Sequence, residues 1–345
     1  MTQALYRRYR PESFSDVRGQ EHITKVLAGG AKDGQVAHAY LFSGRRGIGK
    51  TSVARILAKE LGTTERDIYE IDAASHRGID DIRELKEAVG SLPYESDYKV
   101  YIIDEVHMLT TPAFNALLKT LEEPPEFVIF ILATTELDRL PETIISRCET
   151  HEFQQPSMTV LAKAVQDTAA AEKYTIDEAA ATTIAQAADG SFRDAFGLLE
   201  KCMRAAEEKH ISGELAAEIT GIPANGLIEK IVFDGIADGE PAAALTALQK
   251  AADKNIDPAR LFARVIQTVR QVLLLRFAPD LGEGIKESVG EQLYSKIKKA
   301  ADAGGDSNLH AKTLHTLLSH HNKLSAETLG HLPLELAIIS LTEKK

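Results

Sequence analysis

The sequence predicts an α/β domain with a parallel sheet, followed by a small helical domain and a longer all-helical one. Up to about residue 153, short apolar runs alternate with helical stretches, which is the pattern of parallel strands connected by helices. After Gln155-Pro156 the strand pattern ends, and alanine- and leucine-rich stretches with a 3.6-residue period follow. A glycine-rich turn joins the first apolar run to the next helical stretch. We therefore expect domains over residues 1–156, 157–221 and 222–345.

Four apolar runs are the expected strands, and the clearest helix lies between the last two. The runs are residues 40–42, 68–71, 100–103 and 127–132. The helix covers residues 112–123, with Thr111 placed as its N-cap and Pro112 in its first turn. Its apolar stripe faces inward, and Pro124-Pro125 end it.

Glycines mark the expected boundaries in the helical half of the chain. Asp189-Gly190-Ser191 indicates the end of one helix, with Ser191 capping the next. Gly221-Ile222-Pro223 is the expected boundary between the two helical domains. Beyond it, residues 261–273 have the apolar spacing of a strong amphipathic helix.

Residues 44–51 match the P-loop pattern G-x-x-x-x-G-K-[ST] at every fixed position. An apolar run precedes the pattern and an amphipathic stretch follows it, so a glycine-rich turn that matches by chance is the weaker interpretation. The backbone N–H groups of such a loop, at the positive end of a helix, hold polyphosphate. The sequence therefore predicts nucleoside triphosphate binding, with Lys50 at the outer phosphates and the Thr51 hydroxyl on Mg²⁺. The candidate contacts are Gly44, Gly47, Ile48, Gly49, Lys50, Thr51 and Ser52.

The apolar run at residues 100–103 ends in two carboxylates, Asp104 and Glu105. Two carboxylates at a strand end are weak evidence for triphosphate hydrolysis when they occur alone. Beside a P-loop in the same sheet, they become strong evidence for it. Asp104 is the candidate to hold Mg²⁺ through its water shell, and Glu105 is the candidate to polarise the attacking water. The sequence thus predicts hydrolysis of the triphosphate as well as binding.

Composition and charge are those of a cytosolic globular chain. The 345 residues are 44% hydrophobic and 26% charged, and no apolar run approaches the roughly 20 residues that span a bilayer. The N-terminus lacks the apolar stretch of a secretory signal, and two cysteines cannot form a metal quartet or a disulfide framework. The net charge is -11, but residues 1–60 hold eleven Lys/Arg against five Asp/Glu. This local excess of positive charge would allow one face to bind the phosphate backbone of a nucleic acid. Ordinary solvated surface charge explains the excess equally well.

Several further segments resemble those of clamp-loader ATPases. Residues 144–148 (IISRC) contain a Ser-Arg-Cys signature, and residues 190–194 (GSFRD) resemble a second sensor. The runs DEVH at 104–107, NALLKTLEEPP at 115–125 and LATT at 132–135 extend the match. The chain is similar to the gamma/tau family of bacterial DNA polymerase III subunits, densely over residues 5–200 and loosely thereafter. The resemblance implies an AAA+ P-loop NTPase domain, a helical lid domain and an all-helical C-terminal collar domain for oligomerisation.

The resemblance also implies roles around the nucleotide. Arg147 would be an arginine finger that completes the ATP site of the neighbouring subunit, in trans. Arg193 would approach the γ-phosphate and couple ATP occupancy to the lid. Thr135, or Thr134 if the alignment shifts by one residue, would be the first sensor. An ordinary surface ion pair is the alternative for each arginine. The residues around the adenine would be Arg10, Pro11 and Val17.

Residues 73–83 correspond to a loop and helix start that follow the duplex backbone in clamp loaders. Ser75 and Arg77 are the candidate DNA contacts, and phosphate contacts of this kind fix position without recognising sequence. Asp80 and Asp81 are unfavourable beside phosphate, although they suit the positive end of a helix dipole. Contact with DNA through this loop is therefore a hypothesis.

One departure from the family concerns zinc. Most bacterial relatives carry a four-cysteine zinc module between the helix after the P-loop and the next strand. Here only residues 62–67 separate Leu61 from Ile68, without a cysteine, so we predict no bound zinc. His310, His315, His320 and His321 do not offer a metal site, because spacings of five residues rotate successive side chains around a helix, which favours solvated histidines.

The resemblance implies an ATPase of the DNA polymerase III holoenzyme in the cytoplasm, with ATP and Mg²⁺ as cofactors. Its partners would be the other loader subunits (delta, delta-prime and further copies of itself), the sliding clamp and primed template DNA, with no membrane. Long-form relatives continue into segments that bind the replicative helicase and the polymerase. The sequence is compatible with a natural short form of the subunit and with a shortened piece of a long form.

Three functions compete. The first is a clamp-loader motor, in which ATP binding organises a ring that opens the clamp, and hydrolysis at a primer–template junction releases it. The second is an AAA+ remodeller of replication forks or recombination intermediates, which would be active alone as a homo-oligomer. Such relatives generally lack the Glu-Glu-Pro-Pro and Ser-Arg-Cys context. The third is a non-hydrolysing structural subunit of the loader, which would show a degraded P-loop, whereas the P-loop and both carboxylates are intact here.

Overall fold

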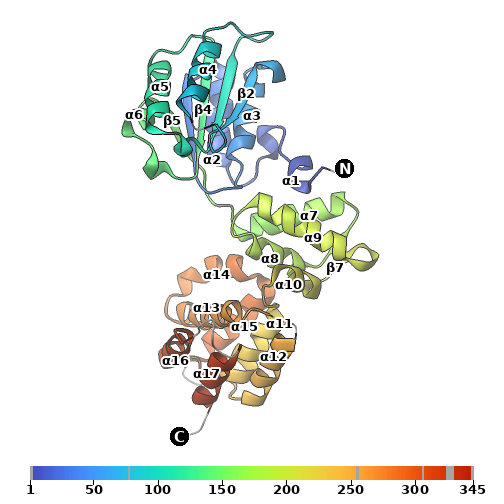
Figure 1. Ribbon diagram of the computed structural model, residues 1–345. Coiled ribbons are helices and arrows are strands. Elements are labelled where there is room, and N and C mark those ends of the chain that lie inside the picture. Colours follow the sequence, from blue (N-terminus) through green and yellow to red (C-terminus); the bar gives the residue numbers. More distant parts are fainter. Residues whose placement is uncertain (1–2, 77, 254–255, 305–306, 324–329, 343–345) are drawn as a thin grey trace. The chain divides into compact units, whose positions relative to one another are not determined.

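The structure is a computed structural model that describes residues 3–76, 78–253, 256–304, 307–323 and 330–342. The chain divides into two compact units, which can be followed along the colours of Figure 1. The first unit comprises residues 1–156 together with 190–194, and the second comprises residues 157–189 and 195–345. The expected three domains stay a prediction.

Within the described residues, the first unit has a five-stranded sheet in the order β2-β3-β4-β1-β5, and each pairing is parallel. This confirms the predicted α/β class. Its elements are α1 (Leu5–Arg8), α2 (Glu21–Asp33), β1 (Ala39–Ser43), α3 (Lys50–Glu60), β2 (Ile68–Asp72), α4 (Ile79–Val89), β3 (Lys99–Asp104), α5 (Thr111–Glu122), β4 (Val128–Thr134), α6 (Glu142–Ile145) and β5 (Glu149–Glu152).

Helices cover both faces of this sheet. Successive residues of a strand point to opposite faces, so neighbouring side chains enter different cores. Leu41 and Phe130 pack with α4 and α5 on one face, while Phe42 and Ile131 pack with α2 and α3 on the other. Because the central strands are buried on both sides, they appear in the sequence as continuous apolar runs. The four predicted strands are confirmed, each slightly longer than its run.

In this unit one expectation is wrong and one strand was missed. Helix α5 begins at Thr111, so the residue before it is Thr110 and the predicted cap is off by one position. The strand β5 is not predicted, because its sequence Glu-Thr-His-Glu contains no apolar run. It lies at the edge of the sheet and pairs with β1 from Tyr40 to Ser43, where polar side chains remain accessible.

The second unit is mainly helical. Its elements are α7 (Met158–Ala171), β6 (Thr175–Ile176), α8 (Glu178–Ala187), most of α9 (Phe192–Ala205), β7 (His210–Ile211), α10 (Gly213–Thr220), α11 (Asn225–Glu229), a π-helix (Lys230–Ala237), α12 (Pro241–Asp253), α13 (Pro258–Phe277), α14 (Gly282–Val289), α15 (Glu291–Asp302), α16 (Ala311–His321) and α17 (Leu332–Thr342). The predicted amphipathic helix is part of α13, where Leu261, Val265 and Val269 are fully buried. The parallel pair β6–β7 is a correction, since two-residue strands are too short to give a sequence pattern.

In the helical half of the chain, Ser191 caps a helix and Gly221 follows one. The Ser191 hydroxyl accepts a hydrogen bond from the Asp194 N–H at 3.2 Å, which confirms its capping role. Gly221 has a left-handed conformation directly after α10. Over the described ranges, no helix is long and apolar enough to cross a membrane.

Candidate active site

In the glycine loop between β1 and α3, the backbone dihedral angles are ones that glycine adopts without strain. Gly44, Gly47 and Gly49 have φ angles of 136°, 77° and 112°. A Cβ atom on Gly44 would lie 2.6 Å from the carbonyl oxygen of Phe153. The loop leads directly into α3 at Lys50, so its N–H groups gather at a positive helix end, which suits a polyphosphate.

Lys50 lies within this loop and is only 6% exposed. Its Nζ donates hydrogen bonds to the carbonyl oxygens of Gly44 (2.6 Å) and Arg45 (2.8 Å). Burial lowers the pKa of Lys50, and the carboxylates of Glu105 and Asp104 act in the opposite direction. The ammonium group is therefore within electrostatic reach of both predicted acidic residues.

The two residues predicted to hold Mg²⁺ are in contact. Thr51 Oγ1 donates a hydrogen bond of 2.8 Å to Asp104 Oδ2 across 53 residues of sequence. A hydroxyl and a carboxylate are the hard oxygen ligands that Mg²⁺ prefers, so this donor set fits the ion.

Glu105 directly follows β3 in a left-handed conformation, with φ 50° and ψ 43°. This conformation is uncommon for a residue other than glycine, and such strain clusters at functional sites. Its carboxylate Oε2 accepts a hydrogen bond of 3.0 Å from Thr135 Oγ1. Thr135 directly follows β4, the neighbour of β3 in the sheet. The predicted general base and the predicted first sensor are thus brought together.

Three residues of the site were not predicted. His107 and Glu136 flank Glu105 and Thr135 in sequence, and both take part in the hydrogen bonds behind them. Tyr6, on α1, also belongs to the site through Arg193. Only His107 had a sequence signal, because it is the last residue of the Asp-Glu-Val-His run.

The residues predicted around the adenine lie in the segment before α2. Arg10 Nε donates a hydrogen bond of 2.9 Å to Ser52 Oγ, which joins two predicted nucleotide contacts. Burial, and then the nearby positive charge of Arg55, lowers the pKa of Arg10. Val17 is buried and packs in the core with α2 and α3.

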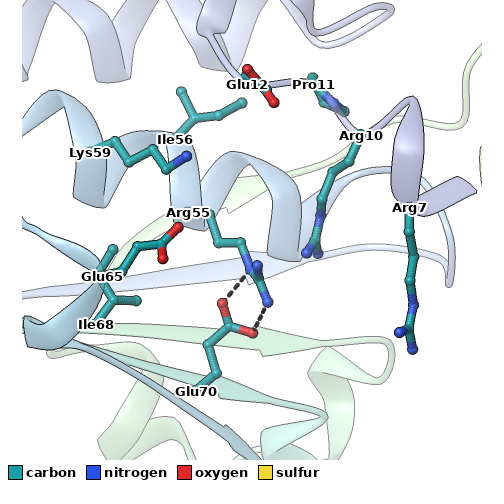
Figure 2. Close-up of a pocket in the computed structure, with 10 residues that line it drawn as sticks. All are labelled: Arg7, Arg10, Pro11, Glu12, Arg55, Ile56, Lys59, Glu65, Ile68 and Glu70. Carbon is teal, nitrogen blue, oxygen red and sulfur yellow. Dashed lines mark hydrogen bonds and ion pairs between the residues drawn. The ribbon is translucent and has the colours of Figure 1, made fainter. Parts of the chain in front are cut away.

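Arg10 and Pro11 also line a pocket of about 480 Å³ beside α3 (Figure 2). Arg55 and Lys59 from α3 line the same pocket, and Arg55 forms an ion pair with Glu70 of β2. The lining is mostly charged, and the glycine loop itself is not part of it. This pocket is therefore adjacent to the predicted nucleotide contacts without containing the phosphate-binding residues.

The segment Gly190–Asp194 packs against the glycine loop in the first unit. The Phe192 N–H donates a hydrogen bond of 3.0 Å to the Gly47 carbonyl oxygen. Arg193 contributes to lowering the pKa of Lys50, which places its charge near the loop. The Arg193 guanidinium also lies over the Tyr6 ring, 5.6 Å from its centroid. The predicted second sensor is therefore part of the cluster.

The remaining predicted residues are not part of this cluster. Arg147 lies after α6 and forms an ion pair of 2.6 Å with Glu122 at the end of α5. The Ser75 hydroxyl donates a hydrogen bond of 2.9 Å to Asp72 Oδ2 in its own loop. Arg77 lies outside the described residues. In the part of the chain that the structure describes, no group of three or more His, Cys, Asp or Glu could hold a metal ion, and the absence of zinc stays a prediction.

The sheet order, the glycine loop and the carboxylates at the strand ends define a P-loop NTPase domain of the AAA+ class. Two family models match the chain. One, described as the DNA polymerase III delta subunit, matches residues 19–74 and 63–157. The other, described as the ATPase lid domain of a DNA polymerase III clamp loader subunit, matches residues 161–205.

Curated relatives extend this similarity over most of the chain. DNA polymerase III subunit tau of Bacillus subtilis is 43% identical over 83% of this chain and 54% of its own length. The tau subunit of Escherichia coli is 37% identical over 80% of this chain and 46% of its own length. The chain belongs to the DNA polymerase III gamma/tau family, and it spans about half the length of these relatives.

Among solved structures, the RuvB Holliday junction branch migration motor of Thermotoga maritima is similar, with a TM-score of 0.53. The match covers 69% of this chain and 85% of RuvB at 22% identity. At that identity the similarity supports the fold alone.

Proposed function

We propose that this chain is the ATP-hydrolysing motor subunit of the bacterial sliding-clamp loader, which loads the clamp onto primed template DNA. The observation that supports this best is the convergence of two pairs, Thr51–Asp104 and Glu105–Thr135, beside the glycine loop. Together they offer a metal site and a base next to a phosphate cradle. Membership in the gamma/tau family supports the clamp-loader context, the polymerase III holoenzyme and a cytoplasmic location.

In this proposal the chain's own groups divide the chemistry among them. The glycine-loop N–H groups and Lys50 bind the phosphates, and the Thr51 hydroxyl with Asp104 holds Mg²⁺. When bound, Mg²⁺ would neutralise charge that develops on the phosphate oxygens. Glu105 polarises the attacking water, and Thr135 keeps the Glu105 carboxylate in place.

The other predicted residues would each contact a different group. Arg147 would act on the ATP of a neighbouring subunit, and its position just after α6, with bonds to Glu122 of α5 and Thr143 of α6, supports a role outside its own site. Arg193 would contact the γ-phosphate of its own subunit. Ser75 and Arg77 would contact DNA, although the Ser75 hydroxyl already bonds to Asp72.

We also propose that residues 157–221 are the lid and residues 222–345 the oligomerising collar. The lid-family match to residues 161–205 supports the first part. Partners would be delta, delta-prime, further copies of this chain and the sliding clamp. The similarity to RuvB does not favour a remodeller, because it extends only to the fold.

The test is steady-state ATP hydrolysis by the protein alone and mixed with clamp, partner subunits and primed DNA. We expect low activity alone, a sharp rise only with the full mixture, and loss of that rise in Arg147→Ala. High activity of the protein alone, stimulated by forked DNA without clamp, would contradict the proposal and favour a remodeller. No hydrolysis in any mixture would favour a structural subunit.

A further inference from the structure

A buried histidine lies directly behind the predicted base and sensor. The side chain of His107 is only 5% exposed, and it follows Glu105 in the short helical turn after β3. Its Nδ1 lies 3.0 Å from Thr134 Oγ1 and 3.6 Å from Glu105 Oε2. Its Nε2 lies 3.4 Å from Glu136 Oε1. The imidazole thus contacts residues on both sides of Thr135.

The contacts around this ring form a closed cycle of two hydrogen bonds and one ion-pair contact. Thr134 Oγ1 accepts the Glu136 N–H at 3.0 Å and is also hydrogen-bonded to His107 Nδ1. In the imidazole tautomer that carries its proton on Nε2, the Thr134 hydroxyl donates to Nδ1 and the Nε2–H faces the Glu136 carboxylate. Arg139 holds the far oxygen of that carboxylate at 2.8 Å. The cycle therefore fixes the backbone turn that contains Thr135.

The position of Thr135 decides where Glu105 lies. Thr135 Oγ1 donates to Glu105 Oε2, and the backbone of Glu105 is strained enough to need such support. A base must be held within a fraction of an ångström of its working position, and a displacement of about 1 Å can lower the rate about a hundredfold.

We infer that His107 is a positioning residue for ATP hydrolysis, which acts on Glu105 through the Thr134–Glu136 turn and the Thr135 hydroxyl. This inference rests on the proposed function. It adds to that proposal a link behind the site through the buried side chain of His107, which has no predicted contact with the nucleotide.

The test compares three substitutions of His107 in the full chain, assembled with its loader partners, clamp and primed DNA. His107→Phe keeps the ring shape and removes the hydrogen bond to Thr134 and the contact with Glu136, so kcat should fall about ten- to a hundredfold with little change in KM. His107→Asn places an amide near Nδ1, and His107→Gln places one near Nε2. Each should restore part of the lost kcat. Affinity for a fluorescent ATP analogue should not change in any variant.

A double substitution separates positioning from packing. If His107 acts through Thr135, then His107→Phe should cost little further activity in a Thr135→Val background. Full, additive loss in that background would overturn the inference, and so would wild-type kcat in His107→Phe. If His107→Phe does not fold by circular dichroism, the same comparison is made with His107→Gln. The matched control is His38→Phe, an exposed histidine just before β1, which should leave kcat unchanged.

Glu105→Gln distinguishes this inference from the proposed function. Wild-type hydrolysis by Glu105→Gln would contradict the proposed base itself. An inactive Glu105→Gln together with a fully active His107→Phe would overturn the role of His107 alone.

Discussion

At Gly47 the phosphate loop has no room for a side chain. Its φ angle is 77°, and a Cβ atom there would collide with the Ser191 hydroxyl and lie 3.3 Å from the Arg193 Cβ. The glycine therefore serves two purposes, since it forms the loop and lets the segment with Arg193 approach it.

Gly47→Ala should weaken nucleotide binding about five- to 150-fold, because strain of this kind costs about 1–3 kcal/mol. Titration with a fluorescent ATP analogue measures the effect. The control is Gly29→Ala in the interior of α2, where a Cβ meets nothing within 4 Å. That change should leave binding unaltered and raise the free energy of unfolding by up to about 1 kcal/mol. If Gly47→Ala binds the ATP analogue with unchanged affinity, the loop accommodates the added methyl group and the prediction is wrong.

Arg147 can be removed without harm to the fold. Its ion pair with Glu122 joins side chains that are 34% and 48% exposed, and pairs of this kind contribute about 0–1 kcal/mol. Arg147→Ala should therefore melt within a few degrees of the wild-type protein by calorimetry, while stimulated hydrolysis is lost.

The matched control for Arg147 is Arg66→Ala, which breaks another exposed ion pair, with Glu95. It should change neither melting nor hydrolysis. Equal loss of activity in both variants would argue that Arg147 has no specific role in the chemistry.

At the scale of elements, a buried carboxylate anchors the loop before β3 to the start of β2. Asp67 is fully buried, and its two oxygens accept N–H bonds from Tyr94 (2.6 Å), Glu95 (2.9 Å) and Ser96 (2.9 Å). Burial alone would raise the pKa of Asp67, but these donors together lower it. The charged form is therefore the one that stabilises the fold.

Asp67→Asn should reduce the free energy of unfolding by about 3 kcal/mol at pH 7, because the amide NH₂ replaces one acceptor oxygen and a hydrogen bond to a charged group contributes about 1.5–3 kcal/mol. In the unfolded chain an aspartate titrates near pH 4, and in the fold its pKa is lower. The contribution is thus complete above about pH 4 and is lost as the pH falls further, through the folded pKa. Urea unfolding at several pH values should show the two proteins converging in acid. Asp97→Asn, exposed in the same loop, is the control and should change nothing.

At the scale of the whole molecule, the proposed site needs two subunits. Lys50 would bind the ATP of its own subunit, and Arg147 would serve the next one. If this is correct, loaders assembled from a mixture of Lys50→Ala and Arg147→Ala chains should contain some intact sites and recover part of the hydrolysis. Each variant alone should be inactive. A mixture as inactive as its components would place Arg147 in its own subunit's chemistry.

Much of this protein follows from local sequence patterns. The glycine loop, the buried strands and the helices α5 and α13 were predictable, because burial on both faces or on one stripe leaves a periodic apolar signal. The strand β5 left no such signal, since an edge strand of Glu-Thr-His-Glu is held by backbone bonds to β1. The pair β6–β7 was missed because two residues cannot show a period.

The P-loop, the acidic strand end and the family were predictable from residue order, because these depend on short runs of fixed residue types. Which groups meet depends on the fold: Thr51 with Asp104, Thr135 with Glu105, and Arg193 with Tyr6. The tertiary structure also revealed the cycle around His107, whose members come from the ends of β3 and β4. The reason is physical, since parallel strands bring their carboxyl ends to one edge of the sheet however far apart they lie in the chain.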